Sequence, residues 1–171
     1  MFEVLVFVYE NYWRGDACPE GEHLQRKLHA VGFENDEIDE ALAWLSGLKL
    51  AAHSTQHPSP ASDDTLALAA PGIPVMLAHP STTSMRVYSA LEQDHLGADC
   101  LGFICFLEAA GVLPAHMREV VVDRAMAVPE SPVSVEDLKI IVLMVYWSFG
   151  EEPDALVLDE LCEDASDRIA H

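Results

Sequence analysis

The segment from Ser134 to Phe149 constrains the fold more than any other part of the chain. After Lys139 it carries no charged side chain, and apolar residues occupy every side of the helix that it would form. Such a helix has to be surrounded by other elements, because apolar surface left in water costs free energy. The pattern therefore predicts a helix, capped by Ser134 over Asp137, at the centre of the carboxy-terminal half.

Further helices are expected on both sides of this segment in the second half of the chain. Ser89 followed by Glu92 is a capping-box pattern that opens a short helix. Apolar residues at helical spacing predict another helix over 101–111, and Pro114 fits the first turn of the next one. Pro153 opens a last, acidic helix. The second half is therefore predicted to be a helical bundle.

The first half shows three apolar stripes at helical spacing, over residues 2–13, 24–31 and 36–48. The second stripe stops at Gly32, where a left-handed helix cap is expected. The third follows Asn35, a good N-cap residue. Three amphipathic helices of this kind predict a compact subdomain whose second and third members have helix-turn-helix spacing.

Residues 53–84 separate these two halves and differ from both in composition. They are rich in Pro, Ser and Thr and contain no Lys, Arg or aromatic residue, which is typical of a flexible linker. Short strand-like patterns occur around Leu66 and over Met85–Tyr88. The sequence thus predicts a mainly α protein: a helical subdomain (1–52) and a helical bundle with an acidic tail (85–171), joined by the linker, with room for a short two-stranded β element.

The charge of the chain limits its possible partners. Nine Lys and Arg stand against 29 Asp and Glu, which gives a formal net charge of −20 and a pI near 4.4. Such a chain is repelled by nucleic-acid backbone and by anionic membrane. No cation precedes the apolar start, and the longest apolar run, 140–147, is too short to span a bilayer. We therefore expect a cytoplasmic protein without membrane contact, with reduced thiols at Cys18, Cys100, Cys105 and Cys162.

Several short blocks occur in a recognisable order along nearly the whole chain, apart from the linker and the tail. They are Met1-Phe2, Val4-Leu5 and Glu10; Gly32-Phe33, Ile38, Ala41-Leu42 and Trp44-Leu45; Ser84-Met85-Arg86-Val87-Tyr88; Cys100, Gly102-Phe103 and Phe106-Leu107-Glu108; Val112-Leu113, Arg118, Val121 and Arg124; Asp137-Leu138-Lys139 and Leu143-Met144-Val145. In this ordered set the chain resembles the Smg family of small bacterial proteins, whose molecular function is not established. The resemblance implies a cytosolic helical protein encoded near genes for DNA processing, and it supplies no catalytic residue, cofactor or ligand.

The residues themselves predict no catalytic, cofactor-binding or metal-binding site. His53 and His57 are four apart, but prolines follow them and no further ligand lies at a suitable spacing. Asp94, His95 and Cys100 form the one constellation that would suit an unrecognised enzyme, since an imidazole can activate a thiol. Five residues of separation would place His95 and Cys100 on different sides of a helix, which argues against that alternative.

The acidic residues instead indicate a module that binds a basic protein partner, which the sequence does not identify. The candidate contacts are Asp36, Glu37, Asp39 and Glu40 at the start of the third helix, with Glu151, Glu152, Asp159 and Glu160 in the tail. The four acids at the start of the third helix also weigh against the alternative of a winged-helix nucleic-acid-binding protein. They occupy the first turns of the helix that would have to contact the DNA.

Three arginines stand out because cations are so scarce in this chain. Arg86, Arg118 and Arg124 either pair with structural carboxylates or contact an anion. Pairing is favoured, and anion contact is kept as an alternative that a shared concave surface would support.

Overall fold

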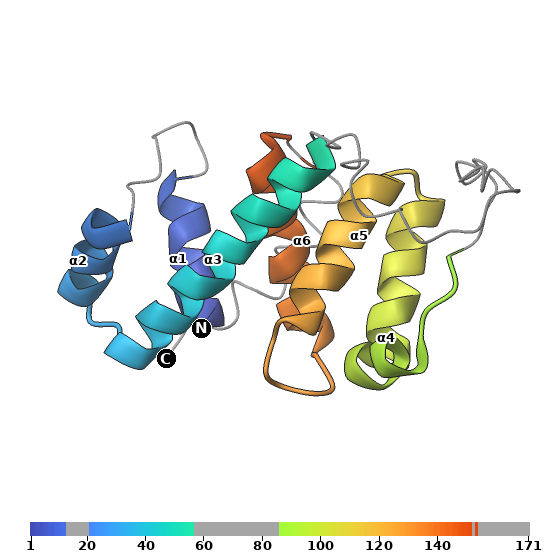
Figure 1. Cartoon of the computed structure of the whole chain (residues 1–171), viewed down its shortest axis with the longest axis horizontal. Helices are drawn as coiled ribbons and strands as arrows, with labels where there is room; N and C mark the ends of the chain where they lie inside the picture. The colour runs from blue at the N-terminus through green and yellow to red at the C-terminus, as the bar shows by residue number, and fades with distance from the viewer. Residues whose placement is uncertain (13–20, 57–85, 152, 154–171) are drawn as a thin grey trace, which may run out of the picture.

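The computed structural model describes residues 1–12, 21–56, 86–151 and 153, which form six helices (Figure 1). In chain order these are α1 (Phe2–Tyr12), α2 (Gly21–Val31), α3 (Asn35–Gln56), α4 (Ala90–Ala109), α5 (Ala115–Met126) and α6 (Val135–Phe149). No strand occurs in the described ranges, so the prediction of a mainly α protein is confirmed. The prediction of a strand at Met85–Tyr88 is wrong for residues 86–88, which have no regular secondary structure. The strand-like pattern around Leu66 lies outside the described residues.

The helix α6, predicted to lie at the centre of the carboxy-terminal half, contacts helices of both halves of the described chain. Every residue from Leu138 to Tyr146 is buried, and α1, α3, α4 and α5 all contact this helix. The cap is also confirmed, since Ser134 Oγ accepts a hydrogen bond from the backbone N–H of Asp137 at 3.0 Å. The buried Lys139 places its ammonium 6.0 Å from the centre of the Phe103 ring.

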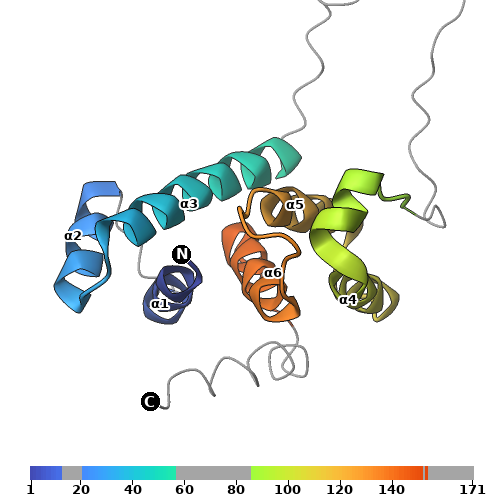
Figure 2. The same ribbon diagram turned by 90° about the horizontal axis from the view of Figure 1, so that it is seen from below.

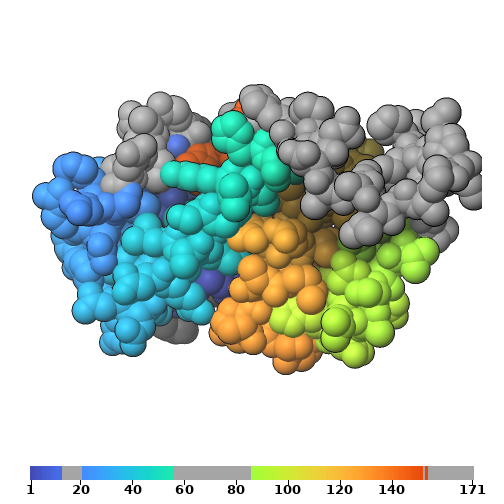
Figure 3. Space-filling model, viewed as in Figure 1, coloured from blue at the N-terminus to red at the C-terminus, as the bar shows by residue number. Residues whose placement is uncertain are grey.

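The other helices are arranged around α6 in two layers. Seen from below, α3 and α5 lie above α1 and α6, with α2 at one end of the array and α4 at the other (Figure 2). The surfaces of α3 and α5 meet on the face shown in Figure 3, where these two helices contact each other directly. Because α2 and α4 are end elements, each has one side that no other described helix covers.

One hydrophobic core unites helices that the sequence divides between two bundles. Leu5, Leu28 and Ile38 from the first three helices belong to the same buried cluster as Ile104, Met117 and Ile141 from the last three. The helix α3 also continues to Gln56, four residues beyond the boundary expected at 52, and Ala52 is its last buried residue. The remainder of the predicted linker lies outside the described residues.

The second helix ends where the sequence indicates. The helix α2 stops at Gly32, whose φ of +110° is easily adopted only by glycine, and both Gly32 and Phe33 donate backbone hydrogen bonds to the carbonyl of Leu28. In α3 the predicted stripe is buried, with Leu42 partly buried, and Trp44 and Ala52 are buried as well; the buried members of the stripe are Ile38, Ala41, Leu45 and Leu48. Trp13, the last residue of the first predicted apolar stripe, lies outside the described residues.

The helix α4 is longer than the sequence indicates. The capping box forms as predicted: Ser89 Oγ accepts from Glu92 N at 3.3 Å, and Glu92 Oε2 accepts from Ser89 N at 2.7 Å. The helix then runs to Ala109 with a kink at Gly97, where φ is +71°. Two helices predicted separately are therefore one kinked helix. Pro114 lies one residue earlier than expected, at the N-cap of α5.

Candidate functional site

Two of the three singled-out arginines lie together between the start of α4 and α5. Arg86 donates from Nε to both carboxylate oxygens of Glu119, at 2.9 and 3.0 Å, and from Nη2 to Glu92 at 2.8 Å. Arg118 donates from Nε and Nη2 to Glu119, at 3.0 and 2.7 Å, and from Nη1 to Glu108. We call Arg86, Arg118, Glu92, Glu108 and Glu119 the arginine–glutamate cluster.

This cluster satisfies its own charges and carries an excess of carboxylate. The hydrogen bond to Glu92 is the largest of the contacts that raise the pKa of Arg86, and Glu119 adds to it. Both arginine side chains are mostly buried, with 18% and 13% of their surface exposed. An anion would have to displace a glutamate that is already bonded, so the geometry of Arg86 and Arg118 fits the favoured carboxylate pairing better than the alternative of an anion contact.

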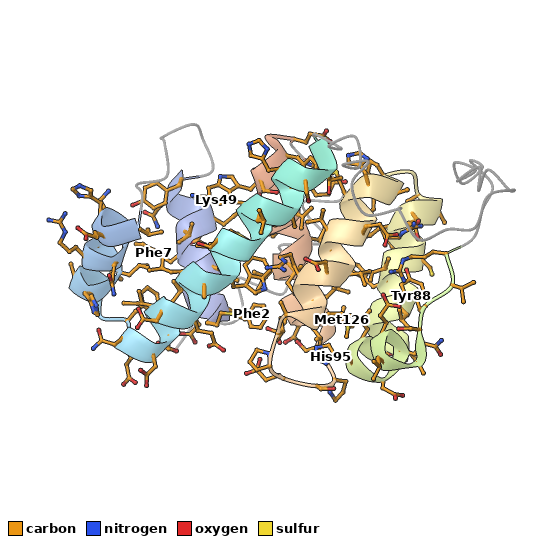
Figure 4. All side chains as sticks on the ribbon, viewed as in Figure 1. Phe2, Phe7, Lys49, Tyr88, His95 and Met126 are labelled. Atoms are coloured by element: carbon orange, nitrogen blue, oxygen red, sulfur yellow. The ribbon has the colours of Figure 1, made fainter. Side chains whose placement is uncertain are left out.

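Tyr88 completes the cluster from the segment that leads into α4 (Figure 4). The guanidinium of Arg86 lies 4.4 Å from the centre of its ring, which is a favourable cation–π arrangement. Burial raises the pKa of Tyr88, and the nearby Glu108 raises it further. In the described part of the chain, Tyr88 Oη and Arg86 Nη1 are buried without a hydrogen-bond partner.

The pKa of Glu92 is lowered to about 2, first by the hydrogen bond from Arg86 and then by the backbone N–H of Ser89. A carboxyl group in the unfolded chain titrates near 4.3. Because the folded pKa is the lower of the two, ionised Glu92 stabilises the fold at pH values above about 4.5. That contribution is lost progressively as the pH falls towards 2.

Replacing Glu92 with Gln is therefore expected to destabilise the protein by about 1 kcal/mol at pH 7, a modest value because the side chain is partly solvated. The difference in unfolding free energy between the two proteins should shrink as the pH falls from 5 to 2. Urea unfolding at pH 7, 4 and 2.5 measures this difference. Arg86→Gln supplies the second substitution of a double-mutant cycle, which measures the coupling energy between Arg86 and Glu92. A coupling energy that does not change with pH would contradict the conclusion that the ion pair with Arg86 lowers the pKa of Glu92.

Arg124 lies apart from the cluster, where α3 crosses α5. Its Nε and Nη2 donate to Asp123 at 2.9 and 2.7 Å, and its backbone carbonyl accepts from Trp44 Nε1 at 3.1 Å. A Cβ atom at Gly47 would lie only 1.9 Å from Nη1 of Arg124, so the absence of a side chain at Gly47 leaves room for the guanidinium. The structure therefore brings together Arg86 and Arg118, and it does not bring Arg124 to them.

The acidic residues predicted to meet a partner lie on the first two turns of α3. Asp36, Asp39 and Glu40 are exposed, and Glu37 is partly exposed with its carboxylate 4.0 Å from the amino group of Met1. Asp39 accepts a hydrogen bond from Gln25 Nε2 at 3.3 Å. Glu151 is also exposed, whereas Glu152, Asp159 and Glu160 lie outside the described residues. The four acids of α3 thus form one solvent-facing group, the α3 acidic face.

The constellation Asp94, His95 and Cys100 does not assemble into a reactive pair. His95 Nε2 lies 3.2 Å from the carbonyl oxygen of Ala125, and Cys100 Sγ donates to the carbonyl of Val133 at 3.2 Å. The kink of α4 lies between the two side chains, and Figure 4 places His95 near the loop that follows α5. Burial raises the pKa of Cys100 to about 11, so its thiol stays protonated at neutral pH.

Glu119 and Asp123 are direct chain neighbours of Arg118 and Arg124, but two other pairings of the arginines are not indicated by the sequence. Glu119 is 33 residues from Arg86, and Glu108 is ten residues from Arg118, so no local spacing connects them. The one available signal was the scarcity of cations, because a mostly buried arginine needs a carboxylate. Within the described ranges, no three His, Cys, Asp or Glu side chains are grouped to hold a metal ion. None of the described helices is long and apolar enough to cross a membrane.

The described residues thus define a class of protein: a helical protein with one hydrophobic core, in which Arg86, Arg118 and Arg124 are hydrogen-bonded to carboxylates of the same chain. The chain matches over residues 1–171 a family described as "Protein of unknown function (DUF494)". Over 171 residues, the whole of both chains, it is 57% identical to the protein Smg homolog of Methylibium petroleiphilum, 56% identical to that of Leptothrix cholodnii and 45% identical to that of Bordetella pertussis. The chain belongs to the Smg family, as the ordered blocks in its sequence predict. No solved structure shows significant similarity to it.

Proposed function

We propose that this protein is a non-catalytic cytoplasmic adaptor that binds a basic protein partner through the α3 acidic face. The observation that carries the proposal is the contrast between its carboxylates and its cations. Asp36 and Glu40 are exposed and have no ion pair within the described part of the chain, whereas Arg86 and Arg118 are mostly buried against glutamates. Arg26, Lys27 and Lys49 are exposed as well, but the α3 acidic face itself offers negative charge to a partner.

Electrostatics of this kind act mainly on the rate and selectivity of association. A net charge of −20 repels other acidic proteins and attracts a partner with a basic surface from a distance set by the ionic strength. Proteins that process DNA carry basic surfaces, because they neutralise phosphates. We therefore propose a DNA-processing protein as the partner.

Reversing the charge of the α3 acidic face is expected to abolish partner binding. Asp36→Lys, Asp39→Lys and Glu40→Lys together replace the attraction by repulsion without touching a buried residue. Immobilised wild-type protein should retain a basic protein from cell extract at low salt and release it at high salt, and the triple variant should retain none. Quantitative mass spectrometry of the eluates measures this, with circular dichroism to verify the fold.

The matched control is Glu3→Lys, Glu10→Lys and Glu130→Lys, which changes the net charge equally at exposed residues elsewhere. Equal loss of binding in the control, or no protein retained by the wild type at low salt, would contradict the proposal. A labelled DNA duplex in the same assay addresses the alternative. The α2–α3 pair has helix-turn-helix connectivity, and Arg26 and Lys27 are exposed on α2, so retention of the duplex would favour nucleic-acid binding.

A further inference from the structure

The outer side of α4, after its kink, is an exposed helix face without charge on a strongly acidic protein. It consists of Ala98, Gly102, Cys105, Phe106 and Ala109, all of which are exposed, and we call it the α4 strip. The opposite side of the helix is buried in the core. Because α4 is an end element whose main contacts are with α5 and α6, none of the described helices covers the strip (Figures 1 and 2).

The centre of the strip is open and apolar. The side chain of Phe106 is 59% exposed, although its ring stacks on Phe103 with the ring centres 6.4 Å apart. A Cβ atom added to Gly102 would have no heavy atom within 4 Å, so another helix can approach closely there. The strip extends over three turns, about 16 Å of helix. An amphipathic helix binds a groove or face through anchors at i, i+3, i+4 and i+7, which span about 10 Å, so the strip is long enough for all four.

The borders of the strip are negative. Asp99 is exposed at one edge. Glu108 lies at the other edge, and half of the side-chain surface of Glu119 is exposed beyond it. The neighbouring cations face inward: the side chains of Arg86 and Arg118 are mostly buried, and Lys139 is 7% exposed.

We propose that the α4 strip binds an amphipathic helix of the partner, with the apolar face of that helix on Phe106 and Gly102 and its lysines or arginines beside Asp99 and Glu119. This inference rests on the proposed function, since it requires a basic partner, and it assigns that partner a second contact and a secondary structure. Charge selects against a second copy of this chain, whose strip has the same negative borders.

The test uses the full-length protein and a fluorescein-labelled helical peptide of leucine and lysine, with leucine at i, i+3, i+4 and i+7. Fluorescence anisotropy at low salt gives the dissociation constant. Gly102→Arg should weaken peptide binding by about tenfold or more, because it puts bulk and a like charge in the middle of the strip. The variant should fold normally, since the added side chain enters open space and arginine favours a helix more than glycine does.

Ala43→Arg is the matched control, because it adds the same charge at an exposed position of α3. It should bind the amphipathic peptide as the wild type does. A peptide of the same composition in scrambled order should bind the wild type more weakly and should not distinguish the two variants. Equal weakening by Gly102→Arg and Ala43→Arg would overturn the inference, because it would show general charge attraction.

Two further results would overturn the strip while leaving the proposed function standing. One is that the charge-reversed α3 variant loses peptide binding while Gly102→Arg binds the peptide as the wild type does, because the peptide would then bind the α3 acidic face and not the strip. The other is a wild-type dimer in sedimentation that Gly102→Arg converts to a monomer, because a second copy would then occupy the strip. The proposed function itself would be contradicted by a different result, namely that the immobilised wild-type protein retains no protein from cell extract.

Discussion

Replacing Val142 with Asp is expected to unfold the protein at room temperature. Val142 has no exposed surface, and the helix that carries it is contacted by α1, α3, α4 and α5. An ionised carboxylate at this position would have neither water nor a cation, and its burial costs several kcal/mol even if the group is protonated instead. The lost packing of the valine adds to this cost. Since domains of this size are stable by only about 5–15 kcal/mol, the sum removes most of the folded population.

Circular dichroism and urea unfolding measure the outcome, and Val87→Asp is the matched control. Val87 is 87% exposed, so the same chemical change there should alter the unfolding free energy by less than about 0.5 kcal/mol. A Val142→Asp protein that retains its helical signal and unfolds within about 1 kcal/mol of the wild type would contradict the central position of α6.

Leu5→Ala is expected to destabilise the whole protein, although Leu5 lies in the first helix and most of the core comes from later ones. The side chain is fully buried in α1, which packs on α3 and α6. Truncating a buried leucine costs about 2–5 kcal/mol. Because one core joins the helices on both sides of residues 57–85, the loss should shift a single cooperative transition.

Two probes of unfolding report on this cooperativity. The fluorescence of Trp147 on α6 and the far-ultraviolet circular dichroism of all helices should shift to lower urea together, after Trp13 and Trp44 are replaced by Phe in all proteins compared. Leu50→Ala removes the same atoms from a side chain that is 73% exposed and should have little effect. Two separate transitions, of which Leu5→Ala moves only one, would instead show two independent bundles.

The parts of the fold that were predictable from the sequence are those determined by local chemistry. The uninterrupted apolar surface of α6, the Ser89–Glu92 capping box and the stop at Gly32 each depend on residues within a few positions of one another. The length of α4 was not predictable in this way. Gly97 indicates a helix end as readily as a kink, and the choice depends on the loop after α5, where Val133 donates a backbone hydrogen bond to the carbonyl of His95.

The candidate site shows the same division. The exposure of the acids at the start of α3 follows from their helical spacing relative to Ile38 and Ala41. The convergence of Arg86 and Arg118 on Glu119 depends on how α4 and α5 pack, and no pattern within one helix contains that information. The α4 strip was hidden for a related reason. The sequence shows apolar residues on two sides of this helix, and only the packed structure shows that Phe106 faces outward.

The arginine–glutamate cluster also fixes the position of the chain immediately before α4. Arg86 is fixed to Glu92 and Glu119 immediately before α4 begins, and α3 is fixed in the core almost to its end at Gln56. The core therefore receives two anchored ends, whatever number of residues connects them. The two ends are held by different chemistry: apolar burial holds the last turns of α3, whereas charge-assisted hydrogen bonds hold Arg86. A change of pH or salt is therefore expected to loosen the second end before the first.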